Sequence, residues 1–456
     1  MVPRLGNRGD RSVTTISSCD TFLARGAATR DGRTLFAKNS DRPEPELQQY
    51  VIVPPLAHPP GASLRVQYIT IPQARETYGF VGAQPRWLWG LEHGVNQWGL
   101  AVGNEAIYTV VQPRETGLLG MDLVRLALER ARTAREAVDV IGRLVEEYGV
   151  GGSAYNPGPG YYDNAFLLVD PLEAWHLETA GRHWVARRVT EDRYAISNEP
   201  SIHAEWDAGS PGLEQFLRRL AAGSDAPSAE TAAVSSPGTT PPGAFPNGLG
   251  VAAQVAGEAG ESAISFAAAV LDRRRPRGQA ACRRGRGLEL LGRGPMDVPG
   301  MMALLRDHYE GTPLGAWSPE ELDIKSICMH STPYHPVRTA GSMVAELDPA
   351  GRQPPVLWLS VGMPCRSIFL PFRMPAGGPE HARSVSAANS WDGWPAEPAL
   401  LPTGPWDTVA ARFAAASPEE RRALRARVEA LERRWSQDPS TWPDWDEALE
   451  QGVQLD

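Results

Sequence analysis

Residues 19–41 read CDTFLARGAATRDGRTLFAKNSD and hold two short runs of strand-forming residues on either side of a turn. β-Branched and aromatic residues gather at 21–24 and again at 34–37, which predicts a strand at each place. Asp31 and Gly32 between the runs form a dipeptide typical of tight β-hairpin turns. The stretch therefore predicts an antiparallel hairpin, around which the rest of the chain can be placed.

A cysteine stands at the start of this hairpin, and four polar residues stand near its end. Counted outward from the predicted turn, Cys19 lies opposite roughly residues 42–44 of the second strand. The thiol then lies beside a cation, an amide, a hydroxyl and a carboxylate, which belong to Lys38, Asn39, Ser40 and Asp41. A nucleophile with such neighbours is a candidate catalytic centre.

The thiol of Cys19 needs activation before it can attack a carbonyl carbon. A free cysteine has a pKa of about 8.5, so little of it is thiolate at neutral pH. A nearby cation lowers this pKa, and a free α-amino group with a pKa of about 8 can take the proton. Cys19 can use its own α-amino group only if the bond to Ser18 is cut. The alternative to a catalytic role is that Cys19 is a small buried apolar residue that takes no part in a reaction.

Further segments match a known family in the expected order. They read PRWLWG at 85–90, GLAVGNEA at 99–106, GMDLVR at 120–125, EAWHLETAG at 173–181 and ISN at 196–198. Together with the hairpin they resemble the secernin-type dipeptidases, a cysteine branch of the N-terminal nucleophile hydrolases related to bile-salt hydrolases and penicillin V acylases. The resemblance covers most of residues 19–202. It implies an α+β fold, a four-layer αββα sandwich with two stacked antiparallel sheets between helical layers.

The resemblance also implies a mechanism, which is amide hydrolysis by a thiol enzyme and, within that class, a dipeptidase. Ser18 beside a self-activating thiol suggests that the leader is removed by autocatalysis. Cys19 would attack the carbonyl carbon, and its own α-amino group, oriented by Asp41, would act as the base. Asn104 and Asn198 would stabilise the tetrahedral oxyanion, and an acyl-enzyme would follow. From the residues alone, both asparagines also suit turns at strand ends.

Cations and aromatic residues complete the expected site. The resemblance places Arg283 near the nucleophile, with Arg286 as the alternative if the register differs, and a guanidinium there would lower the thiol pKa. Lys38 stands where bile-salt hydrolases and penicillin acylases carry an arginine, which leaves their acyl-group specificity open here. The expected substrate-binding residues are Lys38, Asn39, Trp87 and Trp89, although both tryptophans also suit a core.

The composition argues against some kinds of binding partner and cellular location. The 456-residue chain carries a net charge of −9, which argues against nucleic acid as its main partner. It holds no apolar run of about 18 residues or more, so we expect no membrane span. The four cysteines, Cys19, Cys282, Cys328 and Cys365, are too few for a disulfide framework and favour a reducing, cytoplasmic compartment. Assembly into a homo-oligomer stays open.

Cysteine and histidine also occur together near residue 330. Cys328 and His330 form a Cys-x-His pair, His335 follows, and the next cysteine is Cys365. This spacing fits none of the usual structural zinc patterns. The sequence therefore predicts no metal site and no other cofactor.

Composition shifts divide the chain. We expect a leader at 1–18, a hydrolase domain at 19–375, and a Pro/Ala-rich segment with a helical tail at 376–456 that packs on the surface or against a partner subunit. Residues from about 221 to 262 are rich in Ala, Gly, Ser, Pro and Thr and predict a low-complexity insertion.

Hydrophobic periodicity predicts the scaffold of the first half. Apolar residues recur at helical spacing over 120–148, and Thr133 with Glu136 resembles a capping box that separates two helices. Four strand-like segments between 163 and 200 predict a β-meander.

Two other functions stay open at this stage. An acylase of N-acyl amino acids would use the same nucleophile beside an apolar, aromatic pocket, whereas a dipeptidase needs a cation that binds a substrate carboxylate. A secernin-like interaction protein without catalysis is the third possibility. Retention of residues 1–18 would favour it, because the α-amino group of Cys19 would then stay masked.

Overall fold

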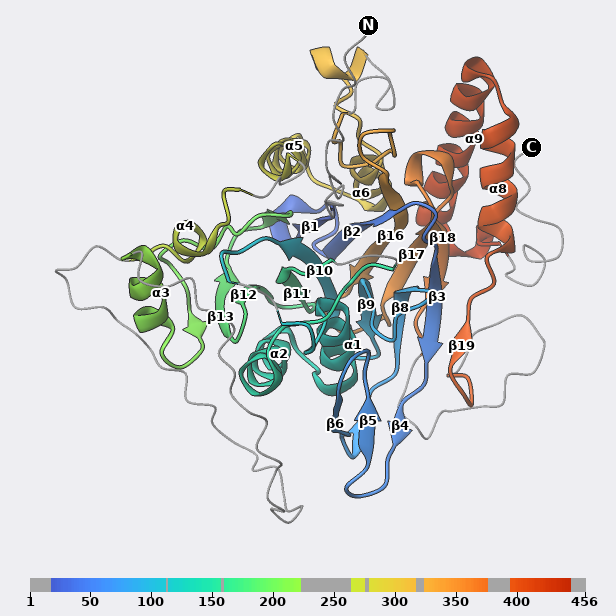
Figure 1. Cartoon of the computed structure of the whole chain (residues 1–456). Helices are drawn as coiled ribbons and strands as arrows, with labels where there is room; N and C mark the ends of the chain where they lie inside the picture. Colours follow the sequence, from blue (N-terminus) through green and yellow to red (C-terminus); the bar gives the residue numbers. More distant parts are fainter. Residues whose placement is uncertain are drawn as a thin grey trace, which may run out of the picture.

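The computed structural model describes residues 18–111, 114–156, 160–222, 264–274, 279–316, 324–375 and 394–443 (Figure 1). The expected leader lies outside these residues up to residue 17. The expected low-complexity insertion lies outside them from residue 223 onward, as does the first part of the C-terminal segment, up to residue 393.

Six strands form the first antiparallel sheet. In spatial order they are β14 (Arg193–Ile196), β1 (Asp20–Ala24), β2 (Thr34–Pro43), β16 (Val337–Leu347), β17 (Val356–Val361) and β18 (Leu370–Arg373). Side chains alternate between the two faces of β2, as they must in a strand. Lys38 contacts the second sheet, whereas Asn39 contacts the end of helix α6 (Val298–Leu305).

Nine strands form the second antiparallel sheet, in the order β15 (Ala208–Gly209), β13 (His183–Val189), β12 (Ala174–Ala180), β11 (Asp163–Val169), β10 (Ala101–Ile107), β9 (His93–Asn96), β8 (Phe80–Pro85), β3 (Gln48–Val53) and β19 (Ala399–Leu400). Two small ribbons extend from it, β4 (Leu56–Ala57) with β7 (Glu76–Thr77), and β5 (Ser63–Arg65) with β6 (Thr70–Pro72) (Figure 1).

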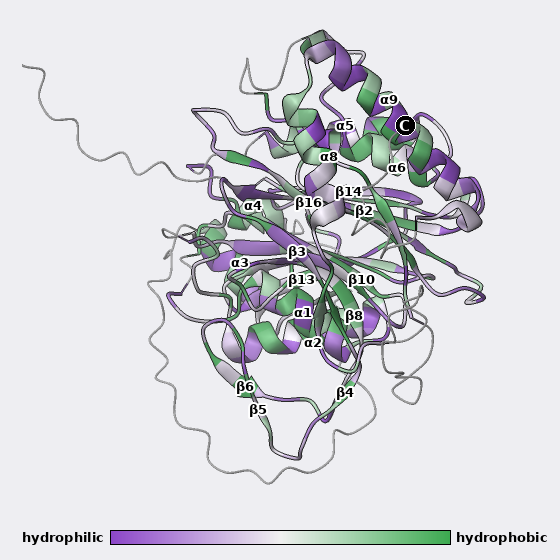
Figure 2. Ribbon diagram, turned by 90° about the vertical axis from the view of Figure 1, so that its right-hand side faces the viewer, coloured by the Kyte–Doolittle hydropathy of each residue, from purple (hydrophilic) through white to green (hydrophobic). Residues whose placement is uncertain are grey.

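Helices cover the outer faces of both sheets, as Figure 2 shows. The predicted pair, α1 (Gly120–Arg130) and α2 (Ala134–Tyr148), packs on the second sheet, and Thr133 accepts the Glu136 N–H at 3.1 Å as the N-cap of α2. The first sheet is covered by α5 (Ala280–Gly292), α6, α8 (Gly404–Ala415) and α9 (Pro418–Gln437). Helices α3 (Leu213–Ala221) and α4 (Phe266–Val270) lie beside β13. The αββα sandwich implied by the resemblance is therefore confirmed.

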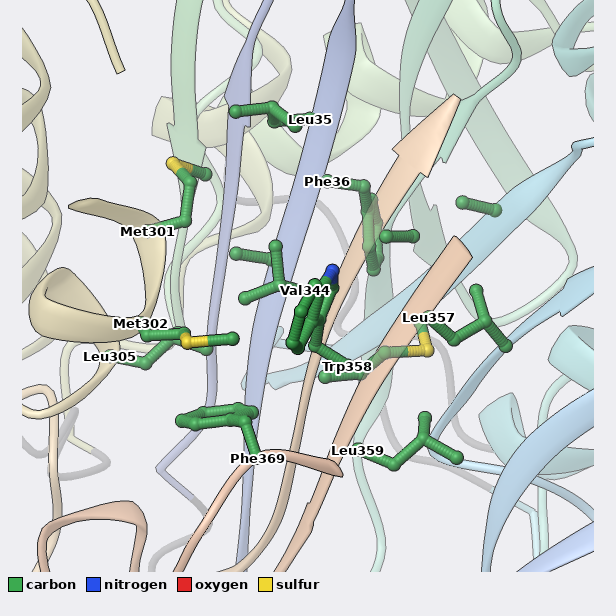
Figure 3. Close-up of a cluster of buried hydrophobic side chains, with 14 of the residues drawn as sticks. Leu35, Phe36, Met301, Met302, Leu305, Val344, Leu357, Trp358, Leu359 and Phe369 are labelled. Carbon is green, nitrogen blue, oxygen red and sulfur yellow. The ribbon is translucent and has the colours of Figure 1, made fainter. Parts of the chain in front are cut away.

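The C-terminal helices belong to the core of this sandwich. Figure 3 shows Met301, Met302 and Leu305 of α6 beside apolar side chains of the first sheet, such as Val344 and Trp358. Side chains of α8 and α9 join the same cluster, among them Trp406, Val428 and Trp435. The helical tail, expected on the surface or against a partner, instead completes one helical layer. None of the helices that the structure describes combines the length and apolarity needed to cross a bilayer.

The hairpin register differs from the predicted one. Asp20 pairs with Asn39, so the connection is centred near residue 30 rather than on Asp31 and Gly32. The reason is the 3-10 helix η1 (Gly26–Ala28), which lengthens the connection on the side of the first strand. Extended by one residue, the register places Cys19 opposite Ser40 rather than residues 42–44.

The last strand of the predicted meander lies in the other sheet. Strands β11, β12 and β13 pair in sequence order, but the outer edge of β13 is taken by β15. Strand β14 instead crosses to the first sheet and pairs with β1, with Ile196 opposite Thr21. This crossing carries Ser197 and Asn198 to the beginning of β1, where Cys19 lies.

Candidate active site

Cys19 stands immediately before β1 and is buried, with 2 % of its surface exposed. Its backbone N–H donates to Asn198 Oδ1 at 2.6 Å. Its Sγ accepts a hydrogen bond from the backbone N–H of Asp41 at 3.4 Å. The nitrogen of Cys19 is here an amide joined to Ser18, and both its position and that of the thiol are fixed by these contacts.

Arg283 of α5 holds the asparagine that contacts Cys19. Its Nη2 donates to Asn198 Oδ1 at 2.6 Å and to Ser197 Oγ at 3.0 Å. Its Nε donates to Asp20 Oδ2 at 2.9 Å, and both members of this ion pair are fully buried. The guanidinium therefore links α5, β1 and the end of β14, and it stands beside the residue predicted to be the nucleophile.

Arg286, the alternative to Arg283, points elsewhere. Its Nη2 donates to Asp307 Oδ1 at 2.7 Å, and its Nη1 donates to Glu289 Oε2 at 2.9 Å. The geometry therefore favours Arg283 as the arginine of the site.

Asp41 offers one carboxylate oxygen to the site. Its Oδ1 accepts from Thr339 Oγ1 at 2.7 Å, whereas its buried Oδ2 accepts no hydrogen bond from the described residues. Burial raises the pKa of Asp41 well above its usual range, although the hydrogen bond from Thr339 opposes the rise. A free α-ammonium group on Cys19 would be a suitable donor for Oδ2, in accord with the orienting role predicted for Asp41.

Lys38 forms an internal ion pair. Its Nζ donates to Glu105 Oε1 at 3.0 Å and to the backbone oxygen of Asn104 at 2.7 Å. Both charged side chains are fully buried, and Glu105 also accepts from the hydroxyl of Thr21. These contacts support an electrostatic role for Lys38, whose charge lowers the pKa of the Cys19 thiol, rather than direct contact with a substrate.

Burial dominates the ionisation of the nucleophile while the leader is attached. It raises the pKa of Cys19 to about 12, and the charges of Glu92, Asp41 and Glu105 add to the rise, whereas Lys38 opposes it. At about pH 8 a thiol of that pKa is only about one part in ten thousand thiolate. The buried thiol of the leader-bearing chain is therefore a weak nucleophile.

This ionisation gives a testable expectation for alkylation. In chains that retain residues 1–18, iodoacetamide at about pH 8 is expected to modify the exposed Cys282 at least about a hundredfold faster than Cys19, because thiolate is the reacting form. Peptide mass spectrometry over a time course measures both rates. The rate at Cys19 should rise with every step in pH up to about 12. Equal rates at the two cysteines would contradict the burial and ionisation described here.

The two asparagines predicted as oxyanion donors make other contacts in this form. Asn198 Nδ2 donates to the Ala106 backbone oxygen at 2.9 Å, while its Oδ1 faces Cys19. Asn104 Nδ2 donates to Asn164 Oδ1 at 3.0 Å. Each amide nitrogen carries two hydrogens, so a role in binding an oxyanion stays a prediction for both.

Asn39 holds the polypeptide around it. Its Nδ2 donates to the backbone oxygens of Leu305 and Ile327, both at 2.8 Å, and its Oδ1 accepts from Ser342 Oγ at 2.7 Å. Both amide hydrogens are thus used inside the protein. These contacts support a structural role for Asn39 rather than the predicted contact with substrate.

The two tryptophans lie in different surroundings. Trp89 is covered by the guanidinium of Arg125, whose Cζ lies 4.2 Å from the ring centroid. Trp87 packs instead with four tyrosines. We call this group the tyrosine cluster, and its members are Tyr68, Trp87, Tyr108, Tyr155 and Tyr162. The same apolar group contains Ala106, whose backbone oxygen contacts Asn198. The tyrosine cluster therefore adjoins the candidate site.

Several charged or polar partners were missed by sequence reasoning. Asp20 and Glu105 each carry a charge within a strongly apolar strand, a signal that could have singled them out. Glu92 is buried, and its Oε1 accepts from Arg42 Nη1 at 3.0 Å. Thr339 gives no sequence signal, because only the pairing of β16 with β2 brings it opposite Asp41.

Comparison with known proteins shows which protein family the site-bearing part of the chain is similar to. Residues 18–211 match the model of peptidase family C69. This match confirms the resemblance predicted from the sequence, and it includes the segments that carry Cys19, Asp41, Asn104 and Asn198.

Curated relatives within this match are dipeptidases. A dipeptidase of Bifidobacterium longum is 28 % identical over 203 residues, which are 39 % of this chain and 36 % of the relative. Probable dipeptidase B of Lactococcus lactis is 29 % identical over 194 residues, which are 40 % of this chain and 38 % of the relative. The match thus spans little more than a third of these relatives. Among solved structures, a mutant conjugated bile acid hydrolase from Clostridium perfringens aligns with 78 % of this chain and 92 % of its own, at 11 % identity and a TM-score of 0.40.

Proposed function

We propose that this protein is a cysteine-nucleophile amide hydrolase, most of all a dipeptidase, which becomes active when removal of residues 1–18 exposes Cys19 as the N-terminal residue. The observation that carries the proposal is the pair of contacts at Cys19. Asn198, itself bound by Arg283, holds the nitrogen of Cys19 at 2.6 Å, and Asp41 lies against its sulfur. A site that fixes both the backbone nitrogen and the sulfur of Cys19 suits a nucleophile whose base is its own α-amine.

Processing would change the chemistry of Cys19 in two ways. The amide N–H that Asn198 now accepts would become an α-amine, with the unpaired Oδ2 of Asp41 as a nearby acceptor. The amine could then accept the thiol proton, a role that the amide nitrogen of the leader-bearing chain cannot fill. The buried charge of Lys38 would favour the resulting thiolate.

The reaction then follows acyl transfer. The sulfur of Cys19 forms a bond to the substrate carbonyl carbon, and its proton moves to the α-amine. The second amide hydrogen of Asn198 would stabilise the oxyanion. That of Asn104, whose Nδ2 also contacts Met121 Sδ at 3.8 Å, would do so after leaving this partner. The C–N bond breaks as the α-ammonium returns the proton to the leaving amine, which yields a thioester. Water, deprotonated by the same amine, hydrolyses the thioester and restores the thiol.

The tyrosine cluster bears on the substrate. The ring centroids of Tyr155 and Tyr162 lie 6.1 Å apart, and their cluster includes Ala106, whose backbone oxygen contacts Asn198. Aromatic side chains in this position would suit an apolar or aromatic side chain beside the scissile amide. We therefore propose dipeptides with an apolar residue on the acyl side. The same aromatic cluster favours an acylase of N-acyl amino acids as the second candidate.

The cellular setting is proposed from the cysteines. None of the four forms a disulfide, and Cys19 and Cys328 are buried. Free thiols favour a reducing compartment, so we place the protein in the cytoplasm. Assembly into a homo-oligomer is compatible with this proposal and is not required by it.

Processing is tested by intact mass and N-terminal sequencing of the purified protein. We expect a chain that begins at Cys19, with a mass lower than that of the full sequence by the mass of residues 1–18. The expectation rests on the need for a free α-amine at the nucleophile. Chains that keep residues 1–18 in both fresh and aged samples would contradict the proposed activation and favour the non-catalytic function.

A further inference from the structure

Two cysteines and two histidines converge at a place outside the candidate active site. One ligand atom each from His308, Cys328, His330 and Cys365 lies within 4.8 Å of all the others. The four residues, which we call the Cys/His cluster, come from three separate segments. His308 follows α6, Cys328 and His330 precede β16, and Cys365 lies in the 3-10 helix η3 (Pro364–Arg366) between β17 and β18.

The distances within the Cys/His cluster match a tetrahedral ion site. His330 Nε2 lies 3.8 Å from Cys328 Sγ, 3.2 Å from Cys365 Sγ and 3.0 Å from His308 Nε2. Around a tetrahedral zinc ion with ordinary bond lengths, sulfur and nitrogen ligands are about 3.6 Å apart and two nitrogens about 3.3 Å apart. The side chains therefore stand at the spacing of zinc ligands.

A second interaction orients one of the imidazoles toward the cluster. His308 Nδ1 lies 3.1 Å from Glu310 Oε1. With its proton on Nδ1, the imidazole donates to this carboxylate and offers the lone pair of Nε2 to an ion. Metal-binding histidines commonly use their second nitrogen in this way. Nε2 then lies on the side of the other ligand atoms, 3.0 Å from His330 Nε2.

We propose that the Cys/His cluster binds one zinc ion in a structural site. Two sulfur and two nitrogen ligands are the set that zinc prefers, whereas calcium and magnesium require oxygen ligands. The protein supplies all four ligands, which leaves no position for a water or a substrate. An ion here would therefore stabilise the fold rather than take part in hydrolysis.

The ion would also hold a segment that reaches the candidate active site. Met329, between two of the ligands, donates its backbone N–H to Thr339 Oγ1 at 2.9 Å, and it accepts from the Thr339 N–H at 3.1 Å. Thr339 in turn donates to Asp41 Oδ1 at 2.7 Å. Zinc is thus proposed to position Thr339, and through it the carboxylate of Asp41.

The sequence predicted no metal here because the ligands are far apart along the chain. His308 precedes His330 by 22 residues, and Cys365 follows it by 35. Only the packing of η3 against the segments around residues 308 and 330 completes the set. His335, which sequence reasoning grouped with Cys328 and His330, is not a member.

Metal analysis of the purified full chain tests this proposal. After dialysis against chelator-free buffer, plasma mass spectrometry is expected to find about one zinc per chain. The double variant Cys328→Ser/Cys365→Ser should hold less than about a tenth of that amount. Cys282→Ser, which removes an exposed cysteine outside the cluster, is the matched control and should keep the full amount.

Cobalt substitution keeps the test informative if the double variant fails to fold. Chelator-treated wild-type protein loaded with Co²⁺ should show the intense visible absorption of tetrahedral cobalt and a thiolate charge-transfer band, and His308→Ala should weaken both. Wild-type protein with neither zinc nor this spectrum would overturn the proposal, as would a Cys328–Cys365 disulfide found by peptide mass spectrometry. Metal content is measured without any substrate, so its result is independent of the proposed hydrolase function.

Discussion

Cys19→Ala is expected to lower the rate of dipeptide hydrolysis by at least about a thousandfold, because it removes the only atom that can form the acyl-enzyme in the proposed mechanism. The comparison is made between two chains that both begin at residue 19, so that processing does not differ. Steady-state hydrolysis of a panel of dipeptides with apolar first residues gives kcat/KM for each chain. Thermal unfolding should show that the variant stays folded, since the change removes a single buried sulfur atom.

Two further chains separate the thiol from the amine. Cys282→Ala, at an exposed position of α5, should keep the full rate. A chain that begins at Ser18 keeps the thiol but holds the nitrogen of Cys19 in a peptide bond, and it should be as inactive as Cys19→Ala. Hydrolysis by the Cys19→Ala chain would rule out the proposed nucleophile. Full activity of a Ser18 chain whose intact mass shows that Ser18 is still attached would rule out the α-amine as the base.

Local sequence signals were sufficient for the strands and helices that frame the site. The residue types of β1 and β2 predicted both strands, and the N-cap at Thr133 predicted the start of α2. The register between β1 and β2 could not be predicted, because it depends on η1, whose residues carry no distinctive turn signal. A shift of a few residues in this register decides whether Cys19 lies opposite Ser40 or opposite residues 42–44.

The assembly of the site depends on contacts that no local pattern encodes. Asn198 reaches Cys19 because β14 leaves the meander and pairs with β1. Arg283 reaches Asn198 because α5 packs on that edge of the first sheet. The family resemblance placed both residues at the site, yet it could not give the orientation of Asn198, whose Oδ1 rather than its N–H faces the nucleophile.

Lys38→Met is expected to lower the free energy of unfolding by about 3–5 kcal/mol at about pH 8, because it leaves the carboxylate of Glu105 buried without its cation. Methionine fills the space of the lysine stem, which passes over Gly103 so closely that a Cβ there would lie 2.6 Å from Lys38 Cδ. The cost therefore comes from the lost charge and from the hydrogen bond that Nζ donates to the Asn104 backbone oxygen. Urea unfolding of the variant and the parent at several pH values measures it.

The pH dependence of this loss identifies Glu105 as its source. Burial raises the pKa of Glu105, and the charge of Lys38 is the largest influence that lowers it. Without Lys38, the folded-state pKa rises further above the unfolded value of about 4.3. A carboxyl with a raised folded-state pKa keeps its stability below the unfolded pKa and loses it as pH rises through the folded pKa. The variant should therefore lose less stability at about pH 5 than at about pH 8.

Two matched variants complete the argument about the buried pair. Lys38→Met/Glu105→Gln removes both charges, so it should recover part of the lost stability and abolish the added pH dependence. Arg218→Met breaks an exposed ion pair with Glu214 on α3 and should cost only about 0–1 kcal/mol. A Lys38→Met protein as stable as its parent at about pH 8 would mean that Glu105 is already neutral in the folded chain.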